Sequence, residues 1–138
     1  MLRSGPMVRE QVRWRDVDMM GVVYYGNYLR FMEAAEHEFF AALGFTYDQL
    51  ASEHGVWIAR THLELDFNAP AKLDDVVICR AELLHIGASS LKFAFPINRE
   101  DGTHLADGAL TLATLDRATL RPTRLPDALR AALPSPSS

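Results

Sequence analysis

Two aspartates followed by a glycine and the start of a long helix are the residues of this sequence best suited to chemistry. Asp16 and Asp18 precede Gly21, and residues 22–27 lead into an apolar helical pattern. A carboxylate can attack a carbonyl carbon or activate a water molecule. The free N–H groups and positive dipole end of a helix start can bind the charge that develops on the carbonyl oxygen. Together they are the minimum equipment for acyl transfer. Asp and Asn also serve as turn residues and helix caps, so the pattern alone leaves a structural role open.

Other familiar catalytic devices are missing from the sequence. There is no Gly-x-Ser-x-Gly, no glycine-rich phosphate-binding motif and no His-x-x-x-His pair. Glu33 and His37 are four residues apart, and we interpret them as a solvated pair beside Glu36 and Glu38. Cys79 lies in an apolar strand pattern, which predicts a buried and inert thiol. We therefore predict no metal site.

A long helix must support this segment. Apolar residues recur at spacings of three and four over 27–43, and Gly44 follows as a stop signal. A shorter helix is predicted over 46–54, and another over 124–133. The apolar positions of the long helix are Tyr28, Phe31, Met32, Ala35, Phe39, Ala42 and Leu43.

Strands make up most of the remaining pattern. The first alternating segment includes Val8, Val12 and Trp14, and we interpret Trp14 as a core residue. Further strands are predicted over 58–67, 76–85, 91–97 and 103–115, with a hairpin turn over 98–102. Because these strands follow one another without crossover helices, we predict a mainly antiparallel sheet of the α+β class, with the long helix packed on it.

Composition narrows the functional classes. The 138 residues are enough for one ordinary domain, and 49% are hydrophobic. A net charge of −4 argues against nucleic-acid binding. No apolar run is long enough for membrane insertion, and the single cysteine excludes an intrachain disulfide and fits a cytoplasmic location. We expect one domain over 1–126, with 1–7 as an extension, and a short terminal helix followed by a disordered Pro/Ser tail over 127–138.

The segment 16–28 reads Asp-Val-Asp-Met-Met-Gly-Val-Val-Tyr-Tyr-Gly-Asn-Tyr and resembles the signature of hot-dog-fold acyl-CoA thioesterases. More narrowly, it is similar to the 4-hydroxybenzoyl-CoA thioesterase branch, with the Tol-Pal-associated acyl-CoA thioesterases most alike. Residues 31–35, 66–75, 87–91 and 121–126 fit later parts of the family pattern. The resemblance covers residues 8–126 and implies an antiparallel sheet wrapped around one central helix.

The resemblance implies a set of site residues. Asp18 is the catalytic carboxylate, as nucleophile or general base, and the backbone N–H of Tyr25 holds the thioester oxygen. The implied substrate-binding residues are Tyr24, Gly26, Glu33, Ser89 and Ser90, with Lys92 or Arg60 assisting at the coenzyme A phosphates.

Two positions depart from the Tol-Pal-associated relatives. Those proteins often have His where Tyr25 stands and Arg where Glu36 stands. The second difference predicts a more acidic helix surface in this protein. Both differences bear on the substrate more than on the reaction.

The resemblance also implies an activity. It is the hydrolysis of a small to medium acyl-CoA, with acyl carrier protein as an alternative donor and no cofactor beyond the coenzyme A of the substrate. Two sheets are expected to pair edge to edge into a homodimer, with the active site at the interface, and dimers to pair into a homotetramer. Two alternatives stay open: a non-catalytic acyl-CoA-binding protein, and a hot-dog hydratase or dehydratase, although the His–acid motif of the latter is missing from the sequence.

Overall fold

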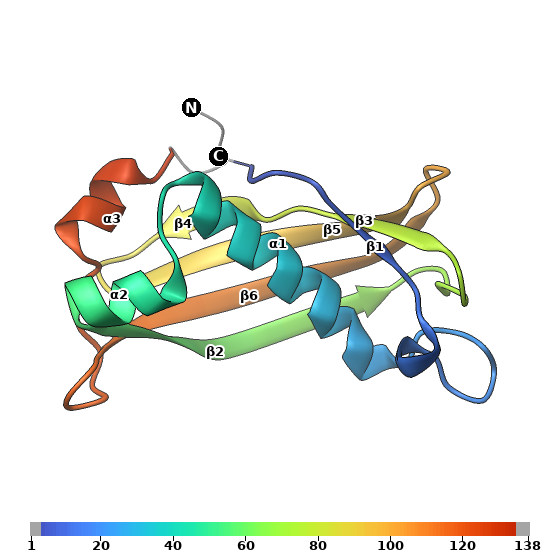
Figure 1. The fold of residues 1–138 in the computed structure, drawn as a ribbon, viewed down its shortest axis with the longest axis horizontal. Helices are drawn as coiled ribbons and strands as arrows, with labels where there is room; N and C mark the ends of the chain where they lie inside the picture. The colour runs from blue at the N-terminus through green and yellow to red at the C-terminus, as the bar shows by residue number, and fades with distance from the viewer. Residues whose placement is uncertain (1–3, 135–138) are drawn as a thin grey trace.

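The computed structural model describes residues 4–134, in which an antiparallel sheet curves around one long helix (Figure 1). This arrangement confirms the predicted α+β hot-dog architecture. The helices and strands, in chain order, are β1 (Val8–Gln11), α1 (Tyr28–Ala42), α2 (Tyr47–His54), β2 (Val56–Phe67), β3 (Val76–Cys79), β4 (Glu82–Ile86), β5 (Ser90–Arg99), β6 (His104–Asp116) and α3 (Asp127–Ala132). Two short 3₁₀ turns, Trp14–Asp16 and Tyr25–Asn27, lie between β1 and α1.

All strand pairs are antiparallel, in the order β1-β3-β5-β6-β2, with β4 also paired to β5. The longest pairing joins β2 to β6 from Val56↔Asp116 to Phe67↔Ala106. The other side of β2 is an edge of the sheet. This long edge strand leaves its backbone groups available for a partner.

The apolar stripe of α1 packs on the sheet, as predicted for residues 27–43. Phe31 and Ala35 are fully buried, and the ring of Phe39 meets that of Phe93 in β5 at 4.8 Å between centroids. Gly108 in β6 lets the helix approach closely, since a Cβ there would lie 2.7 Å from the Met32 side chain. The sheet therefore holds α1 from Phe31 to Phe40, whereas the predicted apolar position Ala42 in the last turn is exposed.

The short helix α2 has strong end signals and confirms the prediction over 46–54. The Thr46 side chain accepts a hydrogen bond from the N–H of Gln49, whose own side chain accepts one from the N–H of Thr46. Gly55 ends the helix with a φ of +69°. This capping fixes Tyr47 at the first position of α2.

Two of the predicted strands are wrong in detail. The run 76–85 is divided into β3 and β4, although both pair with β5 in one register, from Cys79↔Ile97 to Glu82↔Ala94. This register sets Arg80 opposite Pro96, which has no N–H to donate, so the ladder is interrupted there. The first strand ends at Gln11, and Trp14 lies in a 3₁₀ turn with 81% of its surface exposed. The prediction that Trp14 is a core residue is therefore wrong.

The C-terminal helix α3 packs its Leu129 into the core. The predicted tail beyond Pro134 and the first three residues of the predicted extension lie outside the described residues. None of the helices within residues 4–134 is long and apolar enough to cross a membrane.

Candidate active site

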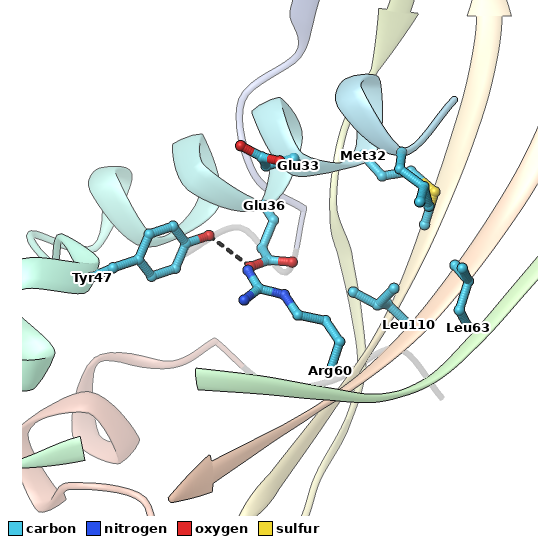
Figure 2. Close-up of a pocket in the computed structure, with 8 residues that line it drawn as sticks. Met32, Glu33, Glu36, Tyr47, Arg60, Leu63 and Leu110 are labelled. Atoms are coloured by element: carbon cyan, nitrogen blue, oxygen red, sulfur yellow. Dashed lines mark hydrogen bonds and ion pairs between the residues drawn. The ribbon is translucent and has the colours of Figure 1, made fainter. Parts of the chain in front are cut away.

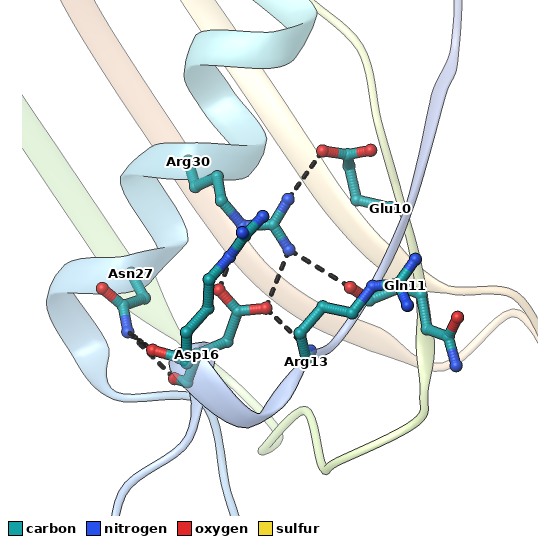
Figure 3. Close-up of polar contacts among 7 residues, drawn as sticks. Glu10, Gln11, Arg13, Asp16, Asn27 and Arg30 are labelled. Atoms are coloured by element: carbon teal, nitrogen blue, oxygen red, sulfur yellow. Dashed lines mark hydrogen bonds and ion pairs between the residues drawn. The ribbon is translucent and has the colours of Figure 1, made fainter.

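A buried carboxylate ties the aspartate-rich turn to α1 (Figure 3). Arg30 donates from Nε to Oδ1 of Asp16 at 3.0 Å and from Nη2 to Oδ2 at 2.8 Å, while the Arg13 N–H donates to Oδ2 at 2.8 Å. A further bond joins Arg30 Nη1 to Glu10 Oε1 at 2.7 Å. Burial acts to raise the pKa of Asp16, but the bonds from Arg30 and Arg13 outweigh it and hold that pKa below its usual value. Asp16 therefore stays ionised and orients the turn.

Asp18 lies at the start of a tight turn beyond this anchor. Its N–H donates to the Val22 carbonyl at 2.9 Å, and its carbonyl accepts from the N–H of Gly21, which has a φ of +76°. The Asp18 side chain is half-buried, and its Oδ1 accepts from the Met20 N–H at 2.8 Å. Within residues 4–134, no hydrogen bond reaches Oδ2. One carboxylate oxygen therefore stays available.

The start of α1 offers two backbone donors. The Tyr24 N–H donates a hydrogen bond to the Asp16 carbonyl at 2.8 Å, and the Asn27 N–H donates one to the Tyr24 carbonyl at 2.8 Å. The N–H groups of Tyr25 and Gly26 have no acceptor in the described part of the chain. The structure thus brings three predicted residues, Tyr24, Tyr25 and Gly26, together where a helix start can bind negative charge.

Two contacts place the Asp18 turn beside this helix start. A bridge pairs Val17 with Val23, and the Tyr24 N–H donates to the Asp16 carbonyl at 2.8 Å. A hollow of about 260 Å³ adjoins the helix start. Its lining residues are Val23, Tyr25, Tyr28, Phe67, Asn68, Ala69 and Pro70.

A larger cavity of about 540 Å³ follows the seam between α1 and β2 (Figure 2). It is lined by Leu29, Met32, Glu33, Glu36, Tyr47, Arg60, Leu63 and Leu110. Glu33 thus lines a cavity that also reaches Leu29 in the first turn of α1.

Glu36 corrects the sequence interpretation of this helix face. We expected an acidic helix surface, but the Glu36 side chain is only 2% exposed. Its Oε1 accepts from the Tyr47 hydroxyl at 2.6 Å and from Arg60 Nη2. Burial and the adjacent Glu36 charge raise the pKa of Tyr47, so the phenol stays protonated. Arg60, which we expected to assist at the phosphates, is instead paired with Glu36.

Sequence reasoning missed this cluster of Glu36, Tyr47 and Arg60, although a signal for part of it exists. Glu36 follows Met32 by four residues and precedes Phe40 by four, so it lies on the buried stripe of α1. A glutamate in that stripe indicates a buried carboxylate that requires a partner.

Ser90 is the first residue of β5, and Ser89 precedes it, at the end of the sheet away from the helix start. Ser90 pairs with Ala113 of β6, which pairs with Ala59 of β2. The helix-start hollow is lined by Phe67 of β2, roughly 25 Å further along that strand at about 3.3 Å per residue. One chain therefore does not bring the two serines to Tyr25. In the described part of the chain, no group of three or more His, Cys, Asp or Glu side chains is placed to hold a metal ion.

Comparisons with known proteins bear on the family and the fold. A family model described as the thioesterase-like superfamily matches residues 12–133. The acyl-CoA thioesterase YbgC of Haemophilus influenzae is 29% identical over 132 residues, covering 96% of each protein.

Solved structures share the fold. The hypothetical protein TT1821 of Thermus thermophilus superposes with a TM-score of 0.84 at 31% identity, covering 92% of this chain and 95% of that one. Slr0204, a 1,4-dihydroxy-2-naphthoyl-CoA thioesterase of Synechocystis, superposes with a TM-score of 0.85 at 20% identity, covering 94% and 95%. The likeness to Slr0204 concerns the fold alone. From the match over residues 12–133 and the sheet wrapped around α1, we conclude that this chain belongs to the thioesterase-like superfamily of hot-dog proteins.

Proposed function

We propose that this protein hydrolyses acyl-CoA thioesters of small to medium acyl groups. The observation that carries the proposal is the placement of the Asp18 turn beside a helix start whose Tyr25 and Gly26 N–H groups are free within the described residues. The names of its relatives support the same activity, since YbgC of Haemophilus influenzae is called an acyl-CoA thioesterase.

The proposed reaction uses these groups in order. The Tyr25 N–H and the α1 dipole polarise the thioester carbonyl and bind the oxygen as it becomes negative. Asp18 attacks the carbonyl carbon to give a mixed anhydride that water then cleaves, or it takes a proton from an attacking water. In both routes water supplies OH to the acid and H to the thiol. The thiolate is a good leaving group, so no strong general acid is required.

We also propose that the working unit is a homodimer joined through β2, which can pair again into a homotetramer. The strand has twelve residues, lies at the sheet edge and exposes Leu63 and Phe67, each by more than 40%. If two β2 edges pair antiparallel about Leu63, Phe67 of one copy faces residue 59 of the other. That pairing would bring the second copy's Ser89 and Ser90 toward the helix start of the first.

The activity is tested by thiol release from a panel of acyl-CoAs with acetyl, hexanoyl, palmitoyl, benzoyl, 4-hydroxybenzoyl and phenylacetyl groups. We expect wild type to hydrolyse part of the panel and Asp18→Asn to lose at least about 10²-fold in turnover, the usual effect of removing one key catalytic group. Asp48→Asn is the matched control, because Asp48 is exposed on α2 and outside both cavities. Normal turnover by Asp18→Asn would remove Asp18 from the catalytic role.

The same panel separates the alternatives. Tight acyl-CoA binding without thiol release would support the binding-protein reading, and hydration of an enoyl-CoA would support a hydratase. The dimer is tested by light scattering of wild type and Leu63→Lys at micromolar concentration. A monomeric wild type would contradict the proposed interface.

A further inference from the structure

The turn between β4 and β5 has its carbonyl groups bound by later parts of the chain. Figure 1 shows α3 beside the end of β4, where this turn begins. From α3, Arg130 Nη2 donates to the carbonyl of Gly87 at 2.7 Å and to that of Ala88 at 3.2 Å. The Thr114 N–H donates to the Ser89 carbonyl at 2.9 Å. Three successive carbonyls of the turn are therefore occupied from within the protein.

The hydrogen-bond donors of the same turn are not used. The N–H groups of Ala88 and Ser89 have no acceptor in the described part of the chain, and neither do the hydroxyls of Ser89 and Ser90. Ala88 is exposed, and both serines are partly exposed. A turn whose carbonyls are bound inside the protein presents only its N–H groups and hydroxyls to a ligand. Such an array of donors suits an anion.

Arg130 brings a positive charge to this turn without a carboxylate partner. None of the ion pairs within residues 4–134 includes Arg130. Its Nε is buried and has no hydrogen-bond partner among the described residues. An unpaired buried donor lowers the stability of the fold, so stability alone does not account for an arginine at this position. The charge instead favours a negatively charged group at the turn.

We propose that Arg130 is a positioning residue for the coenzyme A part of the substrate. By binding the carbonyls of Gly87 and Ala88, it holds the turn with its N–H groups and serine hydroxyls outward, where they donate to a coenzyme A phosphate. Arg130 acts through the turn and does not itself touch the substrate. This role, which rests on the thioesterase activity and the homodimer proposed above, links α3 to substrate binding.

Other contacts hold α3 in place without Arg130. Leu129 in the helix and Leu133 just after it are buried in the core. Leu125, just before the helix, is also buried, and its N–H donates to the Ala88 carbonyl at 3.0 Å. Because these leucines anchor both ends of α3, removing the guanidinium should loosen the turn without releasing the helix.

The turn serves binding and not the reacting group. Ser90 begins β5 at the end of the sheet away from the helix start of the same chain. In the proposed dimer the turn approaches the helix start of the second copy, and the pantetheine arm of coenzyme A spans the distance between thioester and phosphates. Loss of Arg130 should therefore weaken the binding of substrates that carry phosphates and leave the attack on the carbonyl unchanged.

The test compares an acyl-CoA with the matching acyl-N-acetylcysteamine, which has the same thioester but no phosphate or nucleotide. The acyl group is the one of the panel above that wild type hydrolyses fastest. In Arg130→Met, KM for the acyl-CoA should rise roughly 10-fold, the size of one hydrogen bond to a charged group, with kcat within about twofold of wild type. For the acyl-N-acetylcysteamine, kcat/KM should stay within about twofold of wild type.

Three further variants keep the result interpretable. Both bonds to the turn come from one nitrogen, so the ammonium of Arg130→Lys offers donors for the same two carbonyls, and KM for the acyl-CoA should return to within about threefold of wild type. Arg130→Gln is a second neutral variant should Arg130→Met fail to fold. Arg9→Met is the matched control, because it removes one positive charge from an exposed position of β1, and it should leave both KM values unchanged.

Calorimetry with coenzyme A alone tests the turn without turnover, and Kd should rise roughly 10-fold in Arg130→Met. An unchanged KM and Kd in this variant would overturn the role of Arg130 and leave the thioesterase proposal standing. An equal loss of kcat/KM with both thioesters would also overturn it, because a general structural defect does not distinguish them. Absence of turnover with every acyl-CoA would overturn the thioesterase proposal, whereas weaker coenzyme A binding in Arg130→Met would still support the turn as its site.

Discussion

Replacing Asp16 by Asn tests whether the catalytic turn is held by a buried ion pair. Asp16 is 2% exposed and accepts from two nitrogens of Arg30 and from the Arg13 N–H. In Asp16→Asn the charge is lost, and an amide NH₂ replaces one acceptor oxygen and faces N–H donors. Breaking a buried pair from one side costs about 3–5 kcal/mol. We take the lower end, about 3 kcal/mol, because the Arg30 side chain is 27% exposed and keeps its bond to Glu10.

Urea unfolding at pH 7 measures this loss of stability. With a slope of about 2 kcal/mol per molar urea, Asp16→Asn should lower the midpoint by about 1.5 M. Asp18→Asn is the matched control. Asp18 is half-buried and accepts only the Met20 N–H, so its free energy of unfolding should change by about 0.5 kcal/mol or less. The two variants should therefore separate cleanly, with stability lost at Asp16 and turnover lost at Asp18.

The pH dependence provides a second check on Asp16. Since its pKa in the folded protein is lowered, its contribution is fully present above its unfolded pKa of about 4 and is lost as pH falls through the folded value. The stability difference between wild type and Asp16→Asn should be constant from about pH 5 to pH 8 and shrink below about pH 4. A difference under about 1 kcal/mol at pH 7, or one unchanged at low pH, would refute the ion-pair account.

Three further predictions each concern one residue. Tyr28→Phe leaves the buried Ala71 N–H without its acceptor, so thermal unfolding should show a loss of about 1 kcal/mol, a few degrees in Tm. Gly55→Ala places a side chain at a backbone φ of +69° and should lower the free energy of unfolding, measured in urea, by about 1 kcal/mol. An unchanged urea midpoint would contradict the left-handed conformation at this end of α2. Burial raises the pKa of Cys79 to about 12, so iodoacetamide at pH 8 should label the unfolded protein but not the native one.

Local sequence patterns predicted most of the fold, because helix spacing and helix end signals depend on residues that are close in sequence. Spacing and Gly44 located α1 within a residue at each end, and the predicted range 46–54 matches α2 within a residue. The failures came from contacts distant in sequence. The division between β3 and β4 lies opposite Pro96 of β5, and alternation within 76–85 alone does not reveal that pairing. Trp14 continued an alternating pattern that the chain abandons after Gln11.

The site could be predicted only in part, for the same reason. The Asp18 turn and the start of α1 are close in sequence, so one motif indicates both. The cluster of Glu36, Tyr47 and Arg60 joins α1, α2 and β2, and no local pattern links those positions. The separation of Ser89 and Ser90 from Tyr25 follows from strand register, which the sequence leaves undetermined.

The two buried carboxylates differ in how their oxygens are paired. Asp16 uses both oxygens, one for Arg30 Nε and the other for Arg30 Nη2 and the Arg13 N–H, and it lines neither cavity. Glu36 has an arginine partner too, yet both donors crowd one oxygen while the other lies against the cavity. Glu36 therefore keeps one oxygen at the cavity wall, whereas both oxygens of Asp16 are committed to Arg30 and Arg13.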